Sequence, residues 1–320
     1  MLILPEALIA GLVTPEDAFS AVEATFAAMA RGEAANFPVV REALGEGRQY
    51  GFKSGFDRAG ATLGVKSGGY FPGNAEKGLT NHQSVVLLFD PDTGRPTAMV
   101  GGNLLTALRT AAAAAISVDQ LARRDARVLG IVGAGHQAQF QLRAVAKVRR
   151  FEKVLAWNRH PEKLPKLAAV AAEIGLPFEA VTLDRLGAES DVIVTITSSP
   201  KASLLDRHIR AGTHLACMGT DTKGKQEVEP ALLARARLFT DEVAQSVTIG
   251  EAQHAVAEGI IKPEGITPIG AVIAGLAAGR QSDDEVTLFD GTGIGLQDLA
   301  VADVAVRRAI GRGAGETVGV

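Results

Sequence analysis

Lys66 is the first side chain whose surroundings favour chemistry. Apolar residues and glycines flank it, and no acidic residue lies near it in the sequence. Burial among such neighbours would lower its pKa, which suits a proton donor or a lysine that forms a Schiff base. The alternative is an ordinary surface lysine whose alkyl stem lies along the protein. The local sequence leaves both interpretations open.

Arg109 interrupts an otherwise apolar predicted helix. An arginine in that position must be paired or face a ligand, and a carboxylate is its natural two-point partner. That carboxylate belongs either to a substrate or to an acidic residue of the protein itself, and both alternatives stay open. Arg41 lies in a similar but weaker pattern.

Asp221 and His82 are weaker candidates. Asp221 follows a predicted strand and can hold or protonate a substrate nitrogen, although a turn cap is locally the simpler explanation. His82 begins a predicted strand, where a lone histidine is usually a hydrogen-bonded structural residue. No cluster of His, Cys and Asp has metal-ligand spacing, so we expect no metal, and no Ser-His-Asp order suggests a hydrolase.

These side chains need a framework, and the sequence organises it around residues 127–159. Val128–Val132 is an apolar, β-branched run that predicts a short buried parallel strand. A glycine turn, a helix with apolar residues at helical spacing and a second strand at Lys153–Trp157 follow. This order of elements is the context that a dinucleotide-binding turn requires.

The glycine turn has the form Gly-x-Gly-x-x-Ala. Gly133 allows the sharp turn, Gly135 lets a pyrophosphate approach the backbone, and Ala138 lets the helix lie close to the strand. The second strand ends at Asn158-Arg159, without the carboxylate that usually holds the ribose of NAD. Arg159 can pair with a 2′-phosphate or remain a solvated loop charge, so NADP is possible. We expect NADH to be preferred, because Asn158 suffices to bond a ribose hydroxyl.

From residue 127 onward, predicted strands alternate with helices, which indicates a parallel sheet. Ligands of such sheets lie at the carboxyl ends of the strands. The cofactor-binding positions predicted at that edge are Gly133, Ala134, Gly135, His136, Gln137, Asn158, Arg159, Thr197, Ser198, Met218 and Gly219.

Residues 36–102 differ, because their predicted strands are separated by glycine and Asp-Pro turns, which indicates an antiparallel region. A glycine-rich turn and an amphipathic helix near the C-terminus can return to this region. We therefore predict an α/β protein. A discontinuous α+β substrate and dimerisation domain comprises residues 1–118 plus 298–320, and a Rossmann NAD(P)-binding domain comprises residues 119–297.

The composition limits the kinds of partner and the cellular compartment to be expected. The net charge of −3 gives no argument for nucleic acid or a membrane surface, and no apolar run is long enough to span a bilayer. The single cysteine, Cys217, excludes an internal disulfide and fits a reducing cytosol. Because the first residues lack a basic secretory signal, we expect a cytoplasmic protein.

Several stretches together resemble the ornithine cyclodeaminase/μ-crystallin family. They run in family order across nearly the whole chain: GVKSGGYFPGN, NHQSVVLLFD, GNLLTALRTAAAAA, VGAGHQAQ, WNRHPEK, MGTDTKGKQEV and DGTGIGLQD. The resemblance implies a homodimer built through the antiparallel region, binding of NAD(P), and action on small α-imino or α-amino acids. It adds Thr110 to the residues near the pyrophosphate, and His136 replaces the family's more usual small or polar residue.

The resemblance also implies roles for the candidate catalytic and substrate-binding residues. Lys66 matches the active-site lysine, whereas Arg41 and Arg109 match residues that hold the substrate α-carboxylate. Asp221 matches the catalytic aspartate of the cyclodeaminases, a position that other branches fill differently. His82 completes the predicted substrate-binding set.

Within the family, the C-terminal stretches are most similar to reductases of imino acids. We expect NAD(P)H-dependent reduction of a small α-imino acid to an L-amino acid, with iminosuccinate to L-aspartate as the first choice. An imine with two carboxylates needs a second cationic or donor-rich pocket, for which the antiparallel region offers Arg41, Arg48, Lys53, His82 and Ser67. The alternatives are a pyrroline-2-carboxylate reductase, an ornithine cyclodeaminase, an alanine dehydrogenase and, less in keeping with the candidate residues, a non-catalytic NADPH-binding protein.

Overall fold

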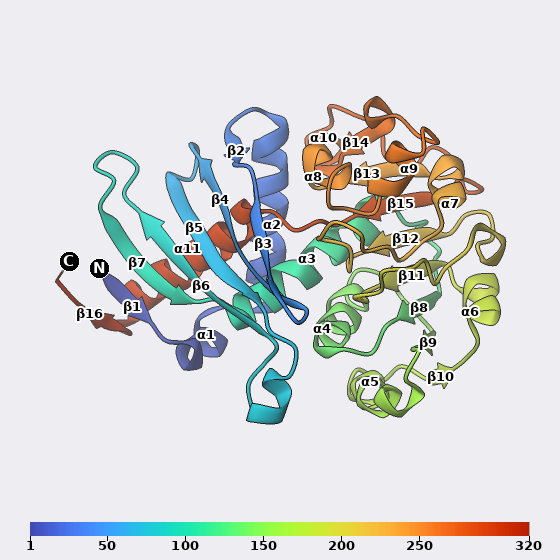
Figure 1. Ribbon diagram of the computed structural model, residues 1–320, viewed down its shortest axis with the longest axis horizontal. Coiled ribbons are helices and arrows are strands. Elements are labelled where there is room, and N and C mark those ends of the chain that lie inside the picture. Colours follow the sequence, from blue (N-terminus) through green and yellow to red (C-terminus); the bar gives the residue numbers. More distant parts are fainter. Residues whose placement is uncertain (320) are drawn as a thin grey trace. The chain divides into compact units, whose positions relative to one another are not determined.

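The chain folds into two compact units in a computed structural model that describes residues 1–319. The sheet unit consists of Met1–Arg109 together with the chain from Ile294 onward, and the Rossmann unit is Thr110–Gly293 (Figure 1). The predicted class, an α/β protein with a Rossmann domain and a second, discontinuous domain, agrees with this architecture.

The unit boundaries lie earlier in the chain than predicted. The sequence predicts boundaries at residues 118/119 and 297/298, whereas the units divide after Arg109 and after Gly293. The first difference has a clear cause, because helix α3 (Asn103–Leu121) continues unbroken through the boundary. Such a helix gives the sequence no local break at which the domains could be separated.

The sheet unit is built on an eight-stranded sheet with the order β16-β1-β7-β6-β5-β4-β2, in which β3 also pairs with β4. Its pairs are antiparallel except β1 with β7, which run parallel. The elements are β1 (Leu2–Leu4), α1 (Glu6–Leu12), α2 (Pro15–Ala30), β2 (Ala34–Asn36), β3 (Val40–Gly45), β4 (Arg48–Asp57), β5 (Thr62–Tyr70), β6 (His82–Phe89), β7 (Pro96–Gly101), α11 (Gly295–Arg312) and β16 (Glu316–Thr317).

Two local sequence signals set the limits of these elements. Thr14 and Asp17 cap α2 reciprocally: the Thr14 hydroxyl accepts the Asp17 N–H at 3.2 Å, and the Asp17 carboxylate accepts the Thr14 N–H at 2.8 Å. In the β6–β7 hairpin, Oδ1 of Asp90 accepts the backbone N–H groups of Asp92 and Thr93 at 2.9 and 2.8 Å. These bonds stabilise the turn that the Asp-Pro-Asp-Thr-Gly sequence predicts.

Helix α11 packs closely against β4 and β5, and glycines on these strands leave room for it (Figure 1). A Cβ on Gly55 of β4 would lie 2.8 Å from Cγ of Leu296, and a Cβ on Gly64 of β5 would lie 2.8 Å from Cδ2 of Leu299. Only glycine permits this approach. The C-terminal helix therefore returns to the first part of the chain, and its polar residues lie directly against the strands.

The Rossmann unit has an eight-stranded sheet with the order β10-β9-β8-β11-β12-β15-β13-β14, in which every pair is parallel. The chain leaves β8 for β9 and β10 on one side and for β11 and β12 on the other, so the strand order reverses between β8 and β11. The elements are β8 (Val128–Val132), α4 (His136–Val145), β9 (Lys153–Trp157), α5 (Leu164–Glu173), β10 (Phe178–Ala180), α6 (Leu183–Glu189), β11 (Val192–Thr195), β12 (His214–Cys217), α7 (Pro230–Arg235), β13 (Arg237–Thr240), α8 (Val243–Ser246), α9 (Gln253–Ala257), β14 (Ile266–Pro268), α10 (Ile269–Ile273) and β15 (Thr287–Asp290).

One predicted helix start in this unit is wrong. The sequence of residues 206–210, Asp-Arg-His-Ile-Arg, predicts the start of a helix, but the chain makes a single 3₁₀ turn at Asp206–His208. Ile209 is already extended, with φ −97° and ψ 119°, and Gly212 has φ +80°, so the backbone leaves the helical region at once. The sequence did not predict strands β10, β14 and β15; β10 and β14 have only three residues each, which carry too little periodicity.

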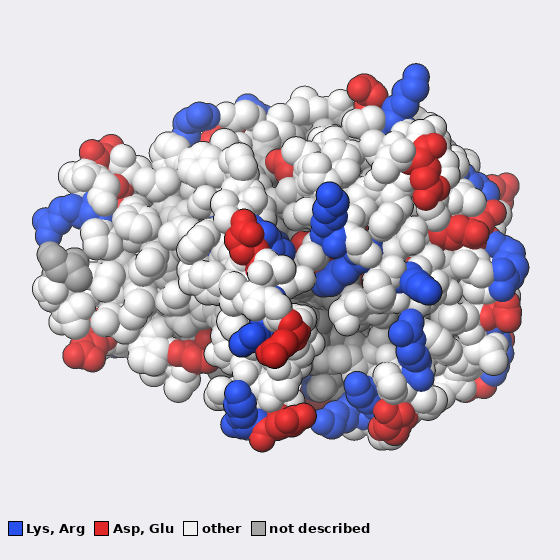
Figure 2. Space-filling view, viewed as in Figure 1, with Lys and Arg blue, Asp and Glu red and all other residues white. Residues whose placement is uncertain are grey.

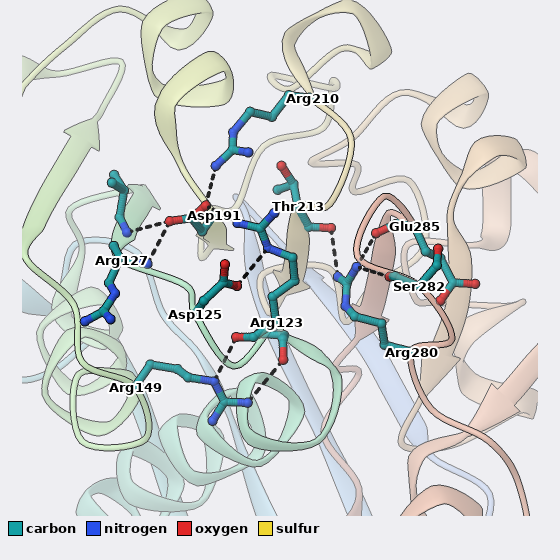
Figure 3. Close-up of polar contacts among 12 residues, drawn as sticks. Arg123, Asp125, Arg127, Arg149, Asp191, Arg210, Thr213, Arg280, Ser282 and Glu285 are labelled. Carbon is teal, nitrogen blue, oxygen red and sulfur yellow. Dashed lines mark hydrogen bonds and ion pairs between the residues drawn. The ribbon is translucent and has the colours of Figure 1, made fainter.

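An arginine network closes the amino edge of the Rossmann sheet (Figure 3). Asp191, directly before β11, accepts the backbone N–H groups of Arg127 and Val128 at 2.7 and 2.9 Å. It also accepts a bond from the guanidinium of Arg123 at 3.1 Å, and Arg149 donates to the carbonyl oxygen of Arg123 at 3.1 Å. These arginines serve the fold, and they lie at the edge opposite to the glycine turn.

The surface carries charges of both signs. Figure 2 shows acidic and basic side chains intermixed over one face of the molecule, without a large area of a single sign, in keeping with the net charge of −3. Among the described helices, none combines the length and the hydropathy that a bilayer span requires.

Candidate active site

Lys66 lies on β5 with its side chain buried, at 6% relative exposure. Its Nζ donates to Oδ1 of Asp298 at 3.1 Å. Burial lowers the pKa of Lys66 to about 8, and the cationic neighbours Arg109 and Arg41 add to the decrease, whereas Asp298 opposes it. Of the two interpretations that the sequence leaves open, the structure shows the buried lysine and not the surface lysine.

Arg109 is buried in the first turns of α3 and also bonds to α11. Its Nε donates to Oδ1 of Asp298 at 3.1 Å, and its Nη1 donates to Oε1 of Gln297 at 3.1 Å. The alternative in which Arg109 pairs with an internal acid is thus what the structure shows. Its role in holding a substrate carboxylate stays a prediction, and the position beside Lys66 is suited to it.

Asp298 belongs to this site although it is not among the residues predicted from the sequence. It is fully buried on α11, and its Oδ1 accepts bonds from both Lys66 and Arg109. Within the described chain, its other oxygen, Oδ2, has no hydrogen-bond partner. Burial alone would raise the pKa of Asp298, but the charges of Arg109, Lys66 and Lys53 hold it below its ordinary value. The sequence feature that points to Asp298 is an aspartate among apolar residues in a predicted amphipathic helix.

Arg41 and His82 are the other two predicted substrate-binding residues, and they differ in how near they lie to Lys66. Arg41, on β3, is half-buried and close enough to influence the pKa of Lys66. His82 is paired with Tyr70, whereas Lys66 is paired with Val86, so His82 lies four residues along the strands from the level of Lys66. Four residues of strand span roughly 13 Å, so His82 is at the margin of the cluster.

The glycine turn has the backbone that the fingerprint requires. Gly133 has φ +115°, a conformation that favours glycine, and its N–H donates to the carbonyl of Trp157 at 2.9 Å. Gly135 is the N-cap of α4, and a Cβ built on it would meet no atom within 4 Å. Open space at a helix N-terminus fits a pyrophosphate. Ala138 is fully buried where the helix meets the sheet.

The end of β9 is arranged around Asn158 and Arg159. The Asn158 amide donates to the carbonyl of His160 at 2.8 Å, and Arg159 donates to Oγ of Ser199 at 3.4 Å. Arg159 is exposed, so the alternative of a solvated loop charge stays open. A hollow of about 480 Å³ lies beside Asn158; its wall includes Trp157, Leu164, Val181, Thr182 and Arg185.

A buried carboxylate that the sequence did not reveal holds the ends of β11 and β12 together. Glu227 accepts the backbone N–H of Thr197 at 2.6 Å and that of Gly219 at 2.8 Å, two of the predicted cofactor positions. It also accepts the Thr195 hydroxyl at 2.6 Å. Burial raises the pKa of Glu227. Nothing in the local sequence distinguishes this glutamate from a solvated one, because its partners come from distant strands.

The other residues predicted at this edge lie at the carboxyl ends of their strands. Met218 is buried directly after β12, and Ser198 is exposed in the loop after β11. Asp221 accepts bonds from Lys225 at 2.7 Å and from the Thr222 hydroxyl at 3.2 Å. Thus Asp221 belongs to the Rossmann unit, whereas Lys66 and Arg109 belong to the sheet unit. No group of three or more His, Cys, Asp or Glu side chains in residues 1–319 is arranged to hold a metal ion.

The remaining cofactor positions are set by the turn and by α3. Ala134 is buried within the turn, whereas His136 is exposed with its ring 5.1 Å from that of Phe140. Gln137 is half-buried, and Thr110 is buried on α3 as the first residue of the Rossmann unit.

The whole sequence was also compared with known protein families and with known proteins. The profile of the ornithine cyclodeaminase/mu-crystallin family matches residues 3–312. The chain belongs to this family. Iminosuccinate reductase of Paracoccus denitrificans (strain Pd 1222) is 63% identical to the chain over 319 residues, which cover 99% of each sequence.

Solved structures of the family have the same fold as this chain. The crystal structure of the Paracoccus denitrificans iminosuccinate reductase in complex with NAD⁺ has a TM-score of 0.95 and 62% identity, and the match covers 100% of this chain and 99% of that one. An archaeal alanine dehydrogenase dimer with bound NAD also has a TM-score of 0.95, with 33% identity and the same coverage. The predicted family and fold are therefore confirmed.

Proposed function

We propose that the chain is an NADH-dependent reductase of α-imino acids that converts iminosuccinate to aspartate. The buried cluster of Lys66, Arg109 and Asp298 carries this proposal. In one site it places cations that can bind a substrate carboxylate and a carboxylate that can bind the substrate nitrogen. The 63% identity to an iminosuccinate reductase supports the choice of substrate.

The reduction adds a hydride to the imine carbon and a proton to the imine nitrogen. The nicotinamide cofactor, when bound, supplies the hydride. Arg109 and Arg41 hold the α-carboxylate and so orient the C=N bond. The ammonium of Lys66 polarises the imine or protonates its nitrogen, and Oδ2 of Asp298 accepts a hydrogen bond from that nitrogen. Asp221 orients the nitrogen or a water molecule.

The cofactor proposal rests on residues of the Rossmann unit. The open space at Gly135 would take the pyrophosphate, and Asn158 would bond a ribose hydroxyl. The hollow beside Asn158 is lined mainly by apolar side chains together with Thr182 and Arg185, which suits the adenosine half of the cofactor. With no carboxylate at this position, NADP is expected as a poorer alternative.

Steady-state kinetics test the substrate. NADH oxidation is followed with oxaloacetate plus ammonium, pyruvate plus ammonium and pyrroline-2-carboxylate, and ammonia release is followed with ornithine plus NAD⁺, because cyclodeamination consumes no NADH overall. We expect kcat/KM for the first mixture to exceed each of the others by at least ~100-fold, because one substrate alone satisfies a second buried charged contact. A preference for pyruvate, the cyclic imine or ornithine would replace the proposal with an alanine dehydrogenase, a pyrroline reductase or a cyclodeaminase. Silence with every substrate would favour a binding protein.

A homodimer is proposed through the outer face of the antiparallel sheet. Large apolar side chains are exposed on neighbouring strands there, among them Val40, Leu44 and Phe52. A contiguous exposed apolar face marks a protein interface, and an archaeal relative is described as a dimer. Light scattering of Phe52→Glu should give a monomer. Leu276→Glu, at an exposed leucine of the Rossmann unit, should leave the dimer intact.

We also propose a cytoplasmic location. The chain's single cysteine, Cys217, is a buried free thiol, which requires no oxidising compartment. Immunodetection in fractionated cells should find the protein with cytoplasmic markers, and enrichment elsewhere would contradict this.

A further inference from the structure

The strand order of the Rossmann unit divides its cofactor edge into two halves. Sheets of this type consist of two mononucleotide-binding halves that meet where the strand order reverses. One half contains β8, β9 and β10, and the hollow beside Asn158, proposed for the adenosine, lies at the end of β9. The other half contains β11, β12 and β15 (Figure 1), so its carboxyl ends are expected to receive the nicotinamide end of the cofactor.

The loops that follow β8, β11 and β12 are in close backbone contact. A Cβ on Gly133, after β8, would lie 2.5 Å from the carbonyl oxygen of Ile196, after β11. A Cβ on Gly219, after β12, would lie 2.1 Å from the carbonyl oxygen of Thr197. Because these distances leave no room for a side chain, the backbone itself forms the surface at this edge of the sheet.

Glu227 joins the two loops of the nicotinamide half through both oxygens of its carboxylate. The sheet itself still connects the strands at Met218, whose N–H donates to the carbonyl of Thr195 at 2.8 Å. Beyond that bond, Oε1 of Glu227 accepts the N–H of Thr197 at 2.6 Å, and Oε2 accepts the N–H of Gly219 at 2.8 Å. The Thr195 hydroxyl also donates to Oε2 at 2.6 Å, and Glu227 is only 1% exposed. A buried side chain thus continues the connection between two strands where their own pairing ends.

Glu251, a second buried glutamate of this region, uses its oxygens differently. Its Oε1 accepts the backbone N–H groups of both Glu227 and Val228, at 2.9 and 2.8 Å, and its Oε2 shares a hydrogen bond with the Thr220 hydroxyl. Burial and the neighbouring charge of Glu227 raise the pKa of Glu251 to about 8. An amide could replace this carboxyl group without losing a bond, because a hydroxyl can donate or accept.

The same replacement at Glu227 would lose a bond. Each of its two oxygens accepts a backbone N–H, whereas a glutamine has one oxygen and one NH₂ group, which cannot accept. Either Thr197 or Gly219 would then have its N–H directed at another N–H. Such a buried, unsatisfied donor is costly, so the loop that carries it would move.

We propose that Glu227 is a positioning residue for the nicotinamide half of the cofactor. By fixing the backbone of Thr197 and Gly219, it shapes the surface on which the nicotinamide and its ribose lie. The glycine turn does not depend on it, because Ile196, which contacts the turn, donates its N–H to the carbonyl of Val132 at 2.9 Å. This inference rests on the proposed cofactor site and extends it to a residue that acts through the two loops.

Glu227→Gln tests the proposal, with Glu229→Gln as a matched control two residues along the chain. Glu229 accepts one backbone N–H, that of Asp206 at 2.9 Å, and an amide oxygen can replace that acceptor. Calorimetric titration measures the Kd of NADH and of ADP-ribose, which lacks the nicotinamide. In Glu227→Gln the affinity for NADH should fall by at least ~10-fold, while that for ADP-ribose stays within about threefold of the wild type. Glu229→Gln should bind both ligands as the wild type does.

Two results would overturn the proposal. An equal loss of affinity for both ligands in Glu227→Gln would show that the residue serves the whole Rossmann unit, and an unchanged affinity for NADH would show that the loops do not need it. Glu251→Gln separates the bonds of Glu227 from the effect of changing any buried glutamate in this region. It should keep its affinity for NADH, and a loss as large as that in Glu227→Gln would contradict the proposal.

Thr195 provides a second route if Glu227→Gln does not fold. Thr195→Val removes the hydroxyl that donates to Oε2 of Glu227 and keeps the shape of the side chain, whereas Thr195→Ser keeps the hydroxyl. The valine variant should lose affinity for NADH more than for ADP-ribose, and the serine variant should restore it. Equal affinities in the valine and serine variants, or loss of folding in both Glu227→Gln and Thr195→Val, would assign these residues to the fold and refute the proposal.

The binding experiment is independent of the proposed reaction, because no substrate is present. If the selective loss occurs in a protein that does not reduce oxaloacetate plus ammonium, the reaction is wrong and the role of Glu227 stands. If the wild type binds NADH no more tightly than ADP-ribose, its nicotinamide half contributes nothing to binding, and the role of Glu227 is refuted whatever the substrate.

Discussion

Nζ of Lys66 lies 3.1 Å from Oδ1 of Asp298, although 232 positions separate the two residues in the chain. The same oxygen accepts a bond from Arg109, so two buried cations depend on one carboxylate. Because Asp298 is on α11, the return of the C-terminal helix to the sheet unit completes the cluster. The long-range bonds of Asp298 to Lys66 and Arg109 therefore tie the candidate active site to the fold.

Removal of the Asp298 charge should destabilise the protein as well as inactivate it. Asp298→Asn leaves Lys66 and Arg109 without their buried counter-ion, which costs about 3–5 kcal/mol in the free energy of unfolding. Urea denaturation measures this change. The double variant with Lys66→Met should lose less stability than the sum of the single variants, because one change removes the charge that the other leaves unpaired. Additive losses would show that the two side chains do not interact.

The pKa of Lys66 predicts the basic limb of the pH profile. With a pKa of about 8, the ammonium is present below that pH and is lost above it, so kcat/KM for reduction should fall as the pH rises through about 8. The pH-dependent formation of the imine affects every variant equally, so the ratio of wild type to Lys66→Arg isolates the enzyme. This ratio should fall above pH 8, because arginine keeps its charge. A ratio that is constant from pH 7 to 9.5 would exclude Lys66 as the titrating group.

The two glycines of the cofactor turn should respond differently to substitution. Gly135→Val places a side chain in open space where the pyrophosphate is expected, so NADH affinity should be lost while the Tm is nearly unchanged. Gly133→Ala forces a non-glycine residue to φ +115°, where a Cβ would also lie 2.5 Å from the carbonyl oxygen of Ile196. It should lower stability by more than ~1 kcal/mol. Unchanged NADH affinity in Gly135→Val would contradict the assigned site.

Asp290 should make the Rossmann unit less stable as the pH rises. Burial raises its pKa to about 7, so the folded state retains a proton that the unfolded state releases above its ordinary pKa of 3.8. The free energy of unfolding therefore falls by up to about 1.4 kcal/mol per pH unit between roughly pH 4 and 7 from this group. Asp290→Asn should flatten the dependence in denaturation curves at pH 5, 6 and 7. An identical slope in wild type and variant would show that Asp290 does not titrate in this range.

The Rossmann core could be predicted because its signals are local. Val128–Val132 and Lys153–Trp157 are strands with the predicted limits, and Gly133 has the positive φ that its place in the fingerprint implies. By contrast, β15 is four residues long and its pairing with β12 and β13 comes from distant sequence. The parallel pairing of β1 with β7 is equally non-local.

The candidate active site was predicted where residue type and neighbours were sufficient. Lys66 and Arg109 stand out as charges among apolar or small residues, and both are buried as that pattern suggests. Asp298 and Glu227 could not be assigned, because their roles depend on partners that only the folded chain brings close. The pairing of Lys53 with Lys66 requires the strand register, which composition does not determine.

The most direct test of the proposed reaction is the identity of its product. The enzyme is incubated with NADH, oxaloacetate and nitrogen-15-labelled ammonium, and the products are analysed by mass spectrometry. We predict labelled aspartate in a one-to-one ratio with the NADH consumed, because the hydride adds to the C=N bond. Unlabelled malate in the same ratio would show that the enzyme reduces the ketone, and this result would contradict the assignment of an imine reductase.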